Sequence, residues 1–560
     1  MNPNTFSTPP FTTTTLSGDT TLQFVSAALD STTHNFYTFE ALRGGLSVNL
    51  AVISGTPNVG SITISPLMFD SSSYSQSSAF HPMAAGTSTL SVVTPPGFTT
   101  PGNLTSTVAT VNAPAISFTS TTYTVGNNLE APAQLVLGAG APMTPAVIIT
   151  VTSNNPNVLL SASPTSAGSS SISLMIAPNQ TASPQFYIQG LLDTGTAMLT
   201  AHDPSNRFTD ASPAMVALTP SGAVFNPNTF TTYNFTTTTF SPDTNVAIAT
   251  AQLNPITHNF AGFEAVRGGF SLIVGMNSMD PNVGTAVGSP VTFNGGDMNM
   301  NINFHPLTAG MTDLTLTQPA GFIMPNNFFK TTATVRPPRI FINGGNDQTV
   351  GFDLQNTVNV SLEVAPPNPV VVTIDSSSGT ISTITINPTV AGGTNVTFNN
   401  VTTTFAGSIV VQGRSLGGTV LTGKAPGYSD SVIKVTVNPS GFTFNPNGFS
   451  SFNFTTSVGQ ADTPLFFLAA ILDPITLNFA GSGSVRGGLT VNLPITSSDG
   501  TVGTITMSPV AFPSNTSSGS AAFHPVGNGM ATLTVGLPTC SGPCGYTMPS
   551  NFNSTIATVQ

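Results

Sequence analysis

The stretch that decides the fold is Arg43-Gly44-Gly45-Leu46-Ser47-Val48-Asn49-Leu50-Ala51-Val52. After the two glycines, apolar residues alternate strictly with small or polar ones. This period of two predicts a β-strand with one face in a core and the other toward solvent. The same pattern follows Arg267-Gly268-Gly269 and Arg486-Gly487-Gly488. We therefore expect three tight glycine turns, each leading into a half-buried strand.

Each glycine-led strand lies inside a repeat of about 110 residues, and such a period indicates a tandem array. Asn2-Pro3-Asn4-Thr5-Phe6 recurs at 226–230 and, with Gly448 in place of Thr, at 445–449. Phe80-His81-Pro82 recurs at 304–306 and 523–525, and every copy closes with Ala-Thr-Val. Two divergent segments of similar length separate the copies. The predicted modules are A1 (1–111), B1 (112–224), A2 (225–335), B2 (336–443) and A3 (444–560).

Short alternating runs continue through every module, and Pro, Gly, Asn and Ser punctuate them. No helical period is sustained over three turns. About seven short strands in about 110 residues is typical of an immunoglobulin-like β-sandwich. We therefore predict an all-β fold, a linear array of five immunoglobulin-like β-sandwich domains with the boundaries given above.

Two stretches, Val147 to Val216 and Arg486 to Val559, resemble bacterial Ig-like tandem repeats of the Big type. The shared motifs are Gly-Gly-apolar, Gly-x-x-x-Leu-Thr and Pro-Gly-Phe. The resemblance implies a large secreted, cell-surface or filament-forming protein. These are scaffold motifs, so they specify a fold family and leave the activity open.

Composition excludes several function classes. Only 6% of the residues are charged, and the net charge is −11. Ten Lys and Arg cannot supply the basic stripe that a nucleic-acid-binding protein needs. No apolar run reaches the length of about 18 residues that a membrane span requires, and no signal peptide is visible. The 38 Phe supply enough apolar surface for packed cores.

Histidines and arginines in the repeated motifs are candidates for binding. A second histidine in A1 and A2, His34 and His258, suggests a zinc or copper site with the Phe-His-Pro histidine. Leu477 stands in that place in A3, so we expect hydrogen-bonded strand-end histidines and no metal.

The arginine of each Arg-Gly-Gly has three interpretations. It recognises a carboxylate or sugar, it caps loop carbonyls or pairs with an acid such as Glu40 or Glu264, or it makes an inter-module contact. The third copy has Gly483 in place of the acid, so the acid is not an essential partner.

Catalytic patterns are absent from the sequence. No Ser-His-Asp set recurs, and there is no nucleophile elbow, phosphate loop or calcium loop. The densest polar cluster is His202-Asp203 with Arg207 and Asp210, which we interpret as a solvated turn. We therefore expect no enzymatic activity, no catalytic residues and no cofactor.

Cys540 and Cys544 are the two cysteines of the chain, in Cys-Ser-Gly-Pro-Cys. Their spacing predicts a small disulfide loop formed in an oxidising compartment. The alternative, a redox-active pair, requires a Cys-x-x-Cys at the start of a helix, and here the spacing is one residue longer.

The leading functional hypothesis is a structural subunit or segment of a bacterial surface stalk, fibre or filament. It would be extracellular or at the cell surface, and it would associate with itself. Its charges are too few to protect exposed strand edges. Both chain ends fall on module boundaries, so we expect a piece of a longer array.

Two alternatives remain open. One is an adhesin or carbohydrate-binding protein that recognises a cell-surface glycan, with Phe98, Phe322 and Tyr546 as candidate platforms. The other is an accessory region of a larger secreted enzyme.

Overall fold

The structure is a computed structural model that describes residues 1, 2, 4, 9–138, 145–448 and 452–560. These residues form β-strands, connecting turns and two short 3-10 helices, η1 (Phe230–Thr232) and η2 (Asn343–Gly345), with no α-helix among them. The prediction of an all-β chain is therefore confirmed. Pro3, Thr5 and Phe6 of the first Asn-Pro-Asn motif, and Phe449 of the third, lie outside the described residues.

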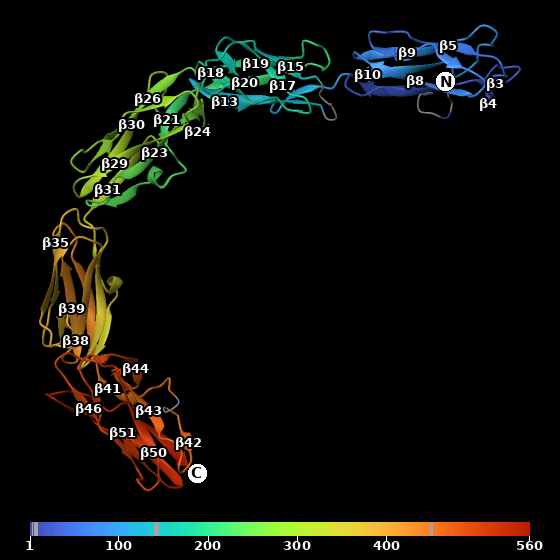
Figure 1. The fold of residues 1–560 in the computed structure, drawn as a ribbon. Helices are drawn as coiled ribbons and strands as arrows, with labels where there is room; N and C mark the ends of the chain where they lie inside the picture. The colour runs from blue at the N-terminus through green and yellow to red at the C-terminus, as the bar shows by residue number, and fades with distance from the viewer. Residues whose placement is uncertain (3, 5–8, 139–144, 449–451) are drawn as a thin grey trace. The chain divides into compact units, whose positions relative to one another are not determined.

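The described chain divides into two compact units. Unit 1 comprises residues 1–235, 244–305 and 312–333, and unit 2 comprises residues 236–243, 306–311 and 334–560. The strands below are grouped by the module names defined above. Two of them, β21 (Ser221–Phe225) and β41 (Ser440–Phe444), begin before the predicted starts of A2 and A3 and are described with the A2 and A3 sheets that they join. Figure 1 labels many of the strands along the chain.

In A1 the larger sheet has the order β1 (Phe11–Thr14), β10 (Ser106–Asn112), β9 (Gly86–Val93), β5 (Val48–Ser54) and β7 (Leu67–Phe69). The second sheet has the order β2 (Thr20–Val25), β8 (Ser75–Pro82) and β6 (Gly60–Ile62). A hairpin of β3 (Ala27–Leu29) and β4 (Phe36–Phe39) accompanies it.

In B1 one sheet has the order β12 (Thr122–Gly126), β20 (Ala214–Thr219), β19 (Gly195–His202), β15 (Val147–Ser153) and β17 (Ser171–Ile176). The second contains β16 (Val158–Ser161), β18 (Phe186–Gly190) and β13 (Leu129–Ala133), and β11 (Ile116–Phe118) pairs with β14 (Leu135–Leu137). A continuous cluster of buried apolar side chains from both sheets forms the core.

In A2 one sheet has the order β21 (Ser221–Phe225), β23 (Thr244–Leu253), β29 (Asn299–Pro306) and β27 (Gly284–Val287), with β24 (Phe260–Phe263) also on β23. The other has the order β22 (Phe235–Thr238), β31 (Lys330–Arg336), β30 (Gly310–Thr317), β26 (Ser271–Ser278) and β28 (Val291–Asn294).

In B2 one sheet has the order β32 (Ile340–Ile342), β34 (Leu354–Leu362), β38 (Phe405–Gly413) and β36 (Ser382–Thr385). The other has the order β33 (Gln348–Gly351), β40 (Ser431–Asn438), β39 (Gly417–Lys424), β35 (Val370–Ser376) and β37 (Asn395–Val401).

In A3 the first sheet has the order β41 (Ser440–Phe444), β43 (Thr463–Leu472), β50 (Ser518–Pro525) and β48 (Gly503–Thr506), with β44 (Phe479–Ser482) on β43. The second has the order β42 (Phe454–Thr456), β53 (Ser554–Val559), β51 (Gly529–Val535) and β47 (Ile495–Ser497). The third has the order β49 (Val510–Phe512), β46 (Val491–Leu493) and β52 (Thr539–Cys540).

A parallel strand pair recurs along the chain. An early strand of the module lies beside its last long strand in β1–β10, β12–β20, β33–β40 and β42–β53. Parallel neighbours need a long connection, since a tight hairpin joins only antiparallel strands. Each of these pairs therefore brings together segments about 90 to 110 residues apart and ties the two ends of a module to one sheet.

The predicted strand after Arg-Gly-Gly forms in every A module. In A2 it is β26, where Leu272, Val274 and Met276 are buried while Ile273 is exposed. In A3 the strand is divided into β46 and β47 because Pro494, which cannot donate a ladder hydrogen bond, stands between them.

A glycine facing a phenylalanine recurs in the core of each A module. A Cβ atom at Gly60, Gly284 or Gly503 would lie 2.1, 2.2 or 2.1 Å from the Cζ atom of Phe80, Phe304 or Phe523, respectively. These three phenylalanines are fully buried. Glycine is required here because the aromatic ring occupies the space of its missing side chain.

We predict that Gly503→Ala destabilises A3 by about 2 kcal/mol or more, because overpacking forces a buried ring off its position. Gly481→Ala is the matched control, since a Cβ there meets nothing within 4 Å. Denaturant unfolding of the full chain measures both. Equal stability of the two variants would contradict the packing argument.

Candidate functional site

Strand pairing continues from B1 into A2 within unit 1. The short strand β25 (Ala265–Val266) pairs antiparallel with β13 of B1, with Leu129 opposite Val266 and Glu130 opposite Ala265. Because β25 directly precedes Arg267-Gly268-Gly269, the pairing holds that turn against B1. This contact region, together with its counterpart between B2 and A3, is called the joint below.

The two glycines of the turn allow close backbone approach. Gly268 N donates to Glu130 Oε2 at 3.0 Å, and Gly269 N donates to the Thr165 carbonyl at 3.0 Å. A Cβ atom at Gly268 would lie 2.2 Å from the carbonyl oxygen of Ser166. Any side chain at this position would therefore push the B1 loop away.

Two carboxyl groups are buried in this joint. Glu130 also accepts a hydrogen bond from Gln189 Nε2 at 3.0 Å, and Glu264 Oε2 accepts one from Gly126 N at 2.7 Å. Burial raises the pKa of Glu130 to about 7 and that of Glu264 to about 8. Both groups are therefore held largely protonated in weakly acidic solution.

Arg267 makes an inter-module contact. Its Nε donates to Asn128 Oδ1 at 3.1 Å, and its guanidinium lies 4.6 Å from the centre of the Phe270 ring. Glu264, named above as one possible acid partner, instead accepts a hydrogen bond from the Gly126 amide. Of the three interpretations of the arginine, the inter-module contact is the one found here.

The joint between B2 and A3 in unit 2 repeats this arrangement with an amide. The strand β45 (Ser484–Val485) pairs with β34, and Gly487 N donates to Gln355 Oε1 at 2.8 Å. Gln412 Nε2 donates to the same oxygen at 3.0 Å. Gln355 and Gln412 thus take the places that Glu130 and Gln189 hold in unit 1.

The unit 2 joint also contains a buried ion pair between Arg486 and Asp353. Arg486 Nε lies 2.5 Å from Asp353 Oδ1, and the aspartate side chain is only 2% exposed. Gly545 N donates to the other carboxylate oxygen at 2.8 Å, and the Tyr546 hydroxyl donates to the Asp353 carbonyl at 3.1 Å. Both carboxylate oxygens of Asp353 thus have a donor from A3.

The three aromatic residues proposed as glycan platforms differ in how far they are exposed to solvent. Phe322 is 8% exposed, and Tyr546 packs on the ring of Phe442, where burial raises its pKa. Phe98 alone of the three remains open, with 43% of its surface exposed. The glycan-platform hypothesis therefore retains one of its three residues.

We predict that Glu130→Gln stabilises unit 1 at pH 9 by about 2 kcal/mol and has little effect at pH 5. The raised pKa means that the folded state keeps its proton while the unfolded chain loses it above the ordinary value of 4.5. The contribution of the neutral carboxyl to the stability of the fold is complete below pH 4.5, and it is lost as the pH rises through about 7.

Gln355→Glu is the reciprocal control. It places a carboxyl in the unit 2 joint and is expected to make that unit less stable at pH 9 than at pH 5. Thermal unfolding at both pH values measures the two variants. A pH-independent effect of Glu130→Gln would contradict a proton-linked joint.

The histidines occupy separate places. His81 Nδ1 lies 2.6 Å from Asp19 Oδ1, at the start of β2, and His524 Nδ1 lies 2.7 Å from Asp462 Oδ1. His34 stands in a turn beyond β3 with a positive φ of 56°, and Leu477 has the same backbone conformation in A3. His81 lies beside the start of β2, and His34 lies beyond the end of β3. The run of β2 and β3, roughly 30 Å of extended chain, therefore separates the two histidines.

Within the described ranges, no three His, Cys, Asp or Glu side chains gather as metal ligands. The polar cluster of B1 differs from the solvated turn that we expected. His202 and Asp210 form an exposed pair at 2.7 Å, but Asp203 is 1% exposed and accepts the backbone amides of Ser205 and Arg207. Asp203 therefore organises the loop from inside it.

The two cysteines are bonded to each other in the structure, with their Cα atoms 6.3 Å apart. Cys540 lies in β52, which pairs with β46, and both cysteines pack against the core of A3. Gly545 and Tyr546, which contact Asp353 in the joint, directly follow the loop that the disulfide closes.

We predict that the intact mass of the unreduced protein is lower by two hydrogens than that of the reduced protein, because Cys540 and Cys544 form the disulfide. Alkylation before and after reduction measures this directly. Two alkylated cysteines without reduction would refute the bond. Cys540→Ser with Cys544→Ser provides a control that shows no mass change on reduction.

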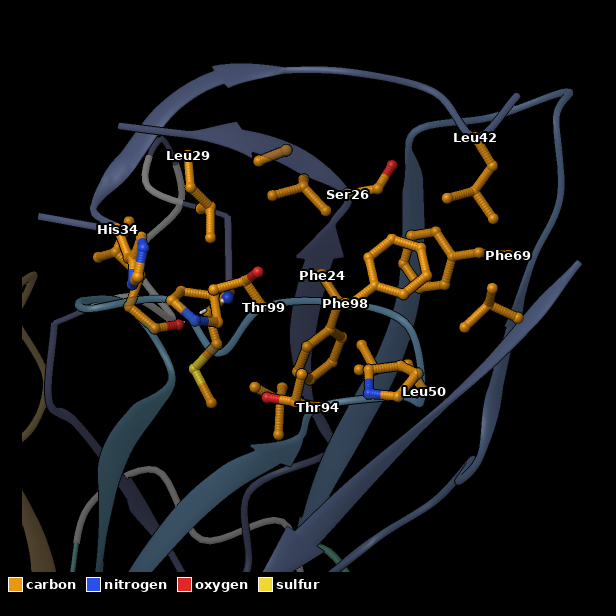
Figure 2. A pocket seen from close by; sticks show the side chains of 18 of the residues that line it. Phe24, Ser26, Leu29, His34, Leu42, Leu50, Phe69, Thr94, Phe98 and Thr99 are labelled. Carbon is orange, nitrogen blue, oxygen red and sulfur yellow. Dashed lines mark hydrogen bonds between the residues drawn. The ribbon is translucent and has the colours of Figure 1, made fainter. Parts of the chain in front are cut away.

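A hollow of about 520 Å³ opens in A1. The loop 94–101 lines one side of it, and the chain from Phe24 to Leu29 lines the other. Figure 2 shows the side chains of Leu29, Leu42, Leu50, Phe69 and Phe98 around this space. The lining combines these apolar side chains with polar ones such as Asp30, His34 and Thr94.

No protein-family model matches the chain, and no curated protein matches it. Among solved structures, surface layer protein SbsC, domains 1–6, matches over 94% of this chain and 66% of that chain, at 11% identity and a TM-score of 0.22. SbsC domains 4–9 match over 92% and 75%, at 11% identity and 0.21. The adhesin InvE of Yersinia pseudotuberculosis matches over 40% and 58%, at 10% identity and 0.16.

These neighbours are bacterial surface proteins, and at such TM-scores they assign no family and carry no argument about function. The resemblance to Big-type repeats stays a prediction. No helix in the described part of the chain has the length and apolar character to cross a membrane.

Proposed function

We propose that the chain is a non-catalytic structural segment of a bacterial surface stalk, fibre or filament, built from five immunoglobulin-like sandwich domains at 1–111, 112–224, 225–335, 336–443 and 444–560. The repeated joint carries this proposal. Strand pairing and a glycine amide on a buried oxygen fix A2 to B1 and A3 to B2. Joints of this kind suit a load-bearing array better than a set of freely hinged modules.

The sheet edges support self-association. Soluble β-proteins normally place Lys or other charges on edge strands to prevent pairing with a second chain. The following outer strands of the sheets hold no charged residue: β7, β17, β28 and β37 at one edge, and β1, β12, β22, β33 and β42 at the other. These edges leave backbone donors and acceptors available for lateral pairing.

Exposed apolar side chains add to this surface. Ile256 and Ile475, at matching turns of A2 and A3, are each 88% exposed, and Met311 and Met530 are 70% and 69% exposed. Contacts between such groups bury apolar area without charge. We propose that copies of the chain associate outside the cell through these uncharged edges and apolar positions.

We predict that the full chain forms oligomers whose size changes little between low and high salt, because screening acts on charges and few are present. Thr292→Lys with Thr397→Lys places charges on the exposed face of β28 and β37 and is expected to reduce association about tenfold or more. Sedimentation velocity over a concentration series measures both effects.

Thr200→Lys with Thr532→Lys is the matched control, since it adds the same charge to exposed positions of the inner strands β19 and β51, outside the proposed surface. It is expected to reduce association less than the edge variant. A strictly monomeric wild-type chain at every salt concentration would refute the self-association proposal.

A further inference from the structure

The hollow in A1 matches a filled position in A2. Arg43 and Arg267, and likewise Val111 and Val335, are 224 positions apart, so the two modules align without a gap between these points. On this alignment Met1 corresponds to Phe225. Phe225 is the last residue of β21, so Met1 stands where that strand ends in A2.

In A2 the strand β21 is held on both sides. It pairs antiparallel with β23, with Gly222 opposite Ala251. From the other side, Ile323 N donates to the Ser221 carbonyl at 2.9 Å, and the Gln318 amide exchanges two hydrogen bonds with the backbone of Ala223. The strand thus lies between β23 and the loop 318–325.

A3 has the same arrangement. Its strand β41 pairs with β43, with Gly441 opposite Ala470, and Thr547 N donates to the Ser440 carbonyl at 2.7 Å. In both modules the inserted strand begins Ser-Gly and ends in a buried phenylalanine, Phe225 or Phe444. The residues that line the A1 hollow, from 24 to 29 and from 94 to 101, are the counterparts of the segments that enclose β21.

Met1 marks where such a strand would end. Its amine donates to the Leu104 carbonyl at 2.8 Å, just as Phe225 N donates to the Phe328 carbonyl at 2.8 Å. Its side chain is 8% exposed, so it already occupies the phenylalanine position. Burial lowers the pKa of this amine to about 6, which is consistent with a place that suits an uncharged peptide N–H.

The Arg-Gly-Gly turn of A1 is the second part of the same surface. Among the described residues, no atom lies within 4 Å of a Cβ placed at Gly44 or Gly45. In the joints, by contrast, the loops of B1 and B2 cover the turn. A Cβ placed at Gly268 or Gly487 would lie 2.2 or 2.0 Å from a carbonyl oxygen of the loop. By the residues that the structure describes, the groove and the turn are thus both left uncovered in A1 and both covered in A2 and A3.

We propose that A1 carries an acceptor site for the end of a B-type module. An extended strand that begins Ser-Gly-apolar, as β21 and β41 do, enters the groove antiparallel to β2 and β3 and ends at Met1. The Glu or Gln side chain of the same B-type module accepts the Gly44 amide, as Glu130 and Gln355 do in the joints. This inference is independent of the proposed surface role, because it concerns what A1 binds and not where the chain acts.

A strand suits the groove better than a small apolar ligand. Both walls present counterparts of the backbone segments that hold β21 and β41 by main-chain hydrogen bonds. Strand addition satisfies such groups and places alternate side chains in pockets. The second residue of the inserted strand must be glycine because a Cβ at Gly222 would lie 2.7 Å from Pro325 Cγ. Pro101 is the counterpart of Pro325 in A1.

The test extends the full chain by the sequence of residues 219–224, Thr-Pro-Ser-Gly-Ala-Val, placed directly before Met1. Hydrogen exchange is then measured in A1 and A3. We expect amides of segments 24–29 and 94–101 to exchange at least about tenfold more slowly than in the unextended chain, and A3 amides to stay unchanged. The control extension carries Glu in place of its glycine and is expected to give no protection.

Equal protection by both extensions, or protection by neither, would overturn the strand-acceptor proposal. Protection of these segments in the unextended chain that rises with protein concentration would assign the groove to a second copy and would also overturn it.

A longer extension, the sequence of residues 112–224 before Met1, tests the turn. It is expected to protect the Gly44 amide, and Glu130→Leu within the added copy is expected to remove that protection while leaving the groove segments protected. An exposed Gly44 amide in this protein would overturn the assignment of the turn.

Discussion

Each joint is organised around a hydrogen bond between a glycine amide and a buried side-chain oxygen: Gly268 to Glu130 in unit 1, and Gly487 to Gln355 in unit 2. A buried amide without an acceptor is costly, so the oxygen sets the position of the turn, and the turn sets the strand that pairs across the joint. A protonated carboxyl and an amide both offer a carbonyl-type oxygen to this amide. The hydrogen bond to Glu130 is therefore sensitive to proton concentration, whereas the one to Gln355 is not.

Several of the scarce charges of this chain lie where most proteins avoid them. Asp353 and Arg486 form a buried pair, and Glu130 and Glu264 are buried carboxyls, whereas the sheet edges named above hold no charge. Burying an ionisable group costs free energy unless partners compensate it. Here the partners are backbone amides and an opposite charge supplied by the next module. Groups that would destabilise a single module thus make the contact between two modules specific.

Much of the fold could be predicted from local pattern. Strict alternation after Arg-Gly-Gly identified β26 because one face of a half-buried strand must be apolar. The joint could not be found this way. Glu130 is a lone acid in an apolar strand, and its partner Gly268 lies 138 positions away, so no local pattern connects them. The burial of Asp203 could not be predicted for the same reason. A turn with many polar residues indicates exposure to solvent, but the burial of one side chain depends on how the loop folds back on the module.

The correspondence between the open groove and β21 or β41 has a consequence for folding. Any chain that leaves the groove empty contains two internal strands with the shape to enter it. During refolding from a fully denatured state, A1 then competes with A2 and A3 for the same short segments, and capture of a segment from another molecule produces a strand-exchanged dimer. Synthesis from the N-terminus reduces this competition, because A1 is complete before the strands of the later modules emerge.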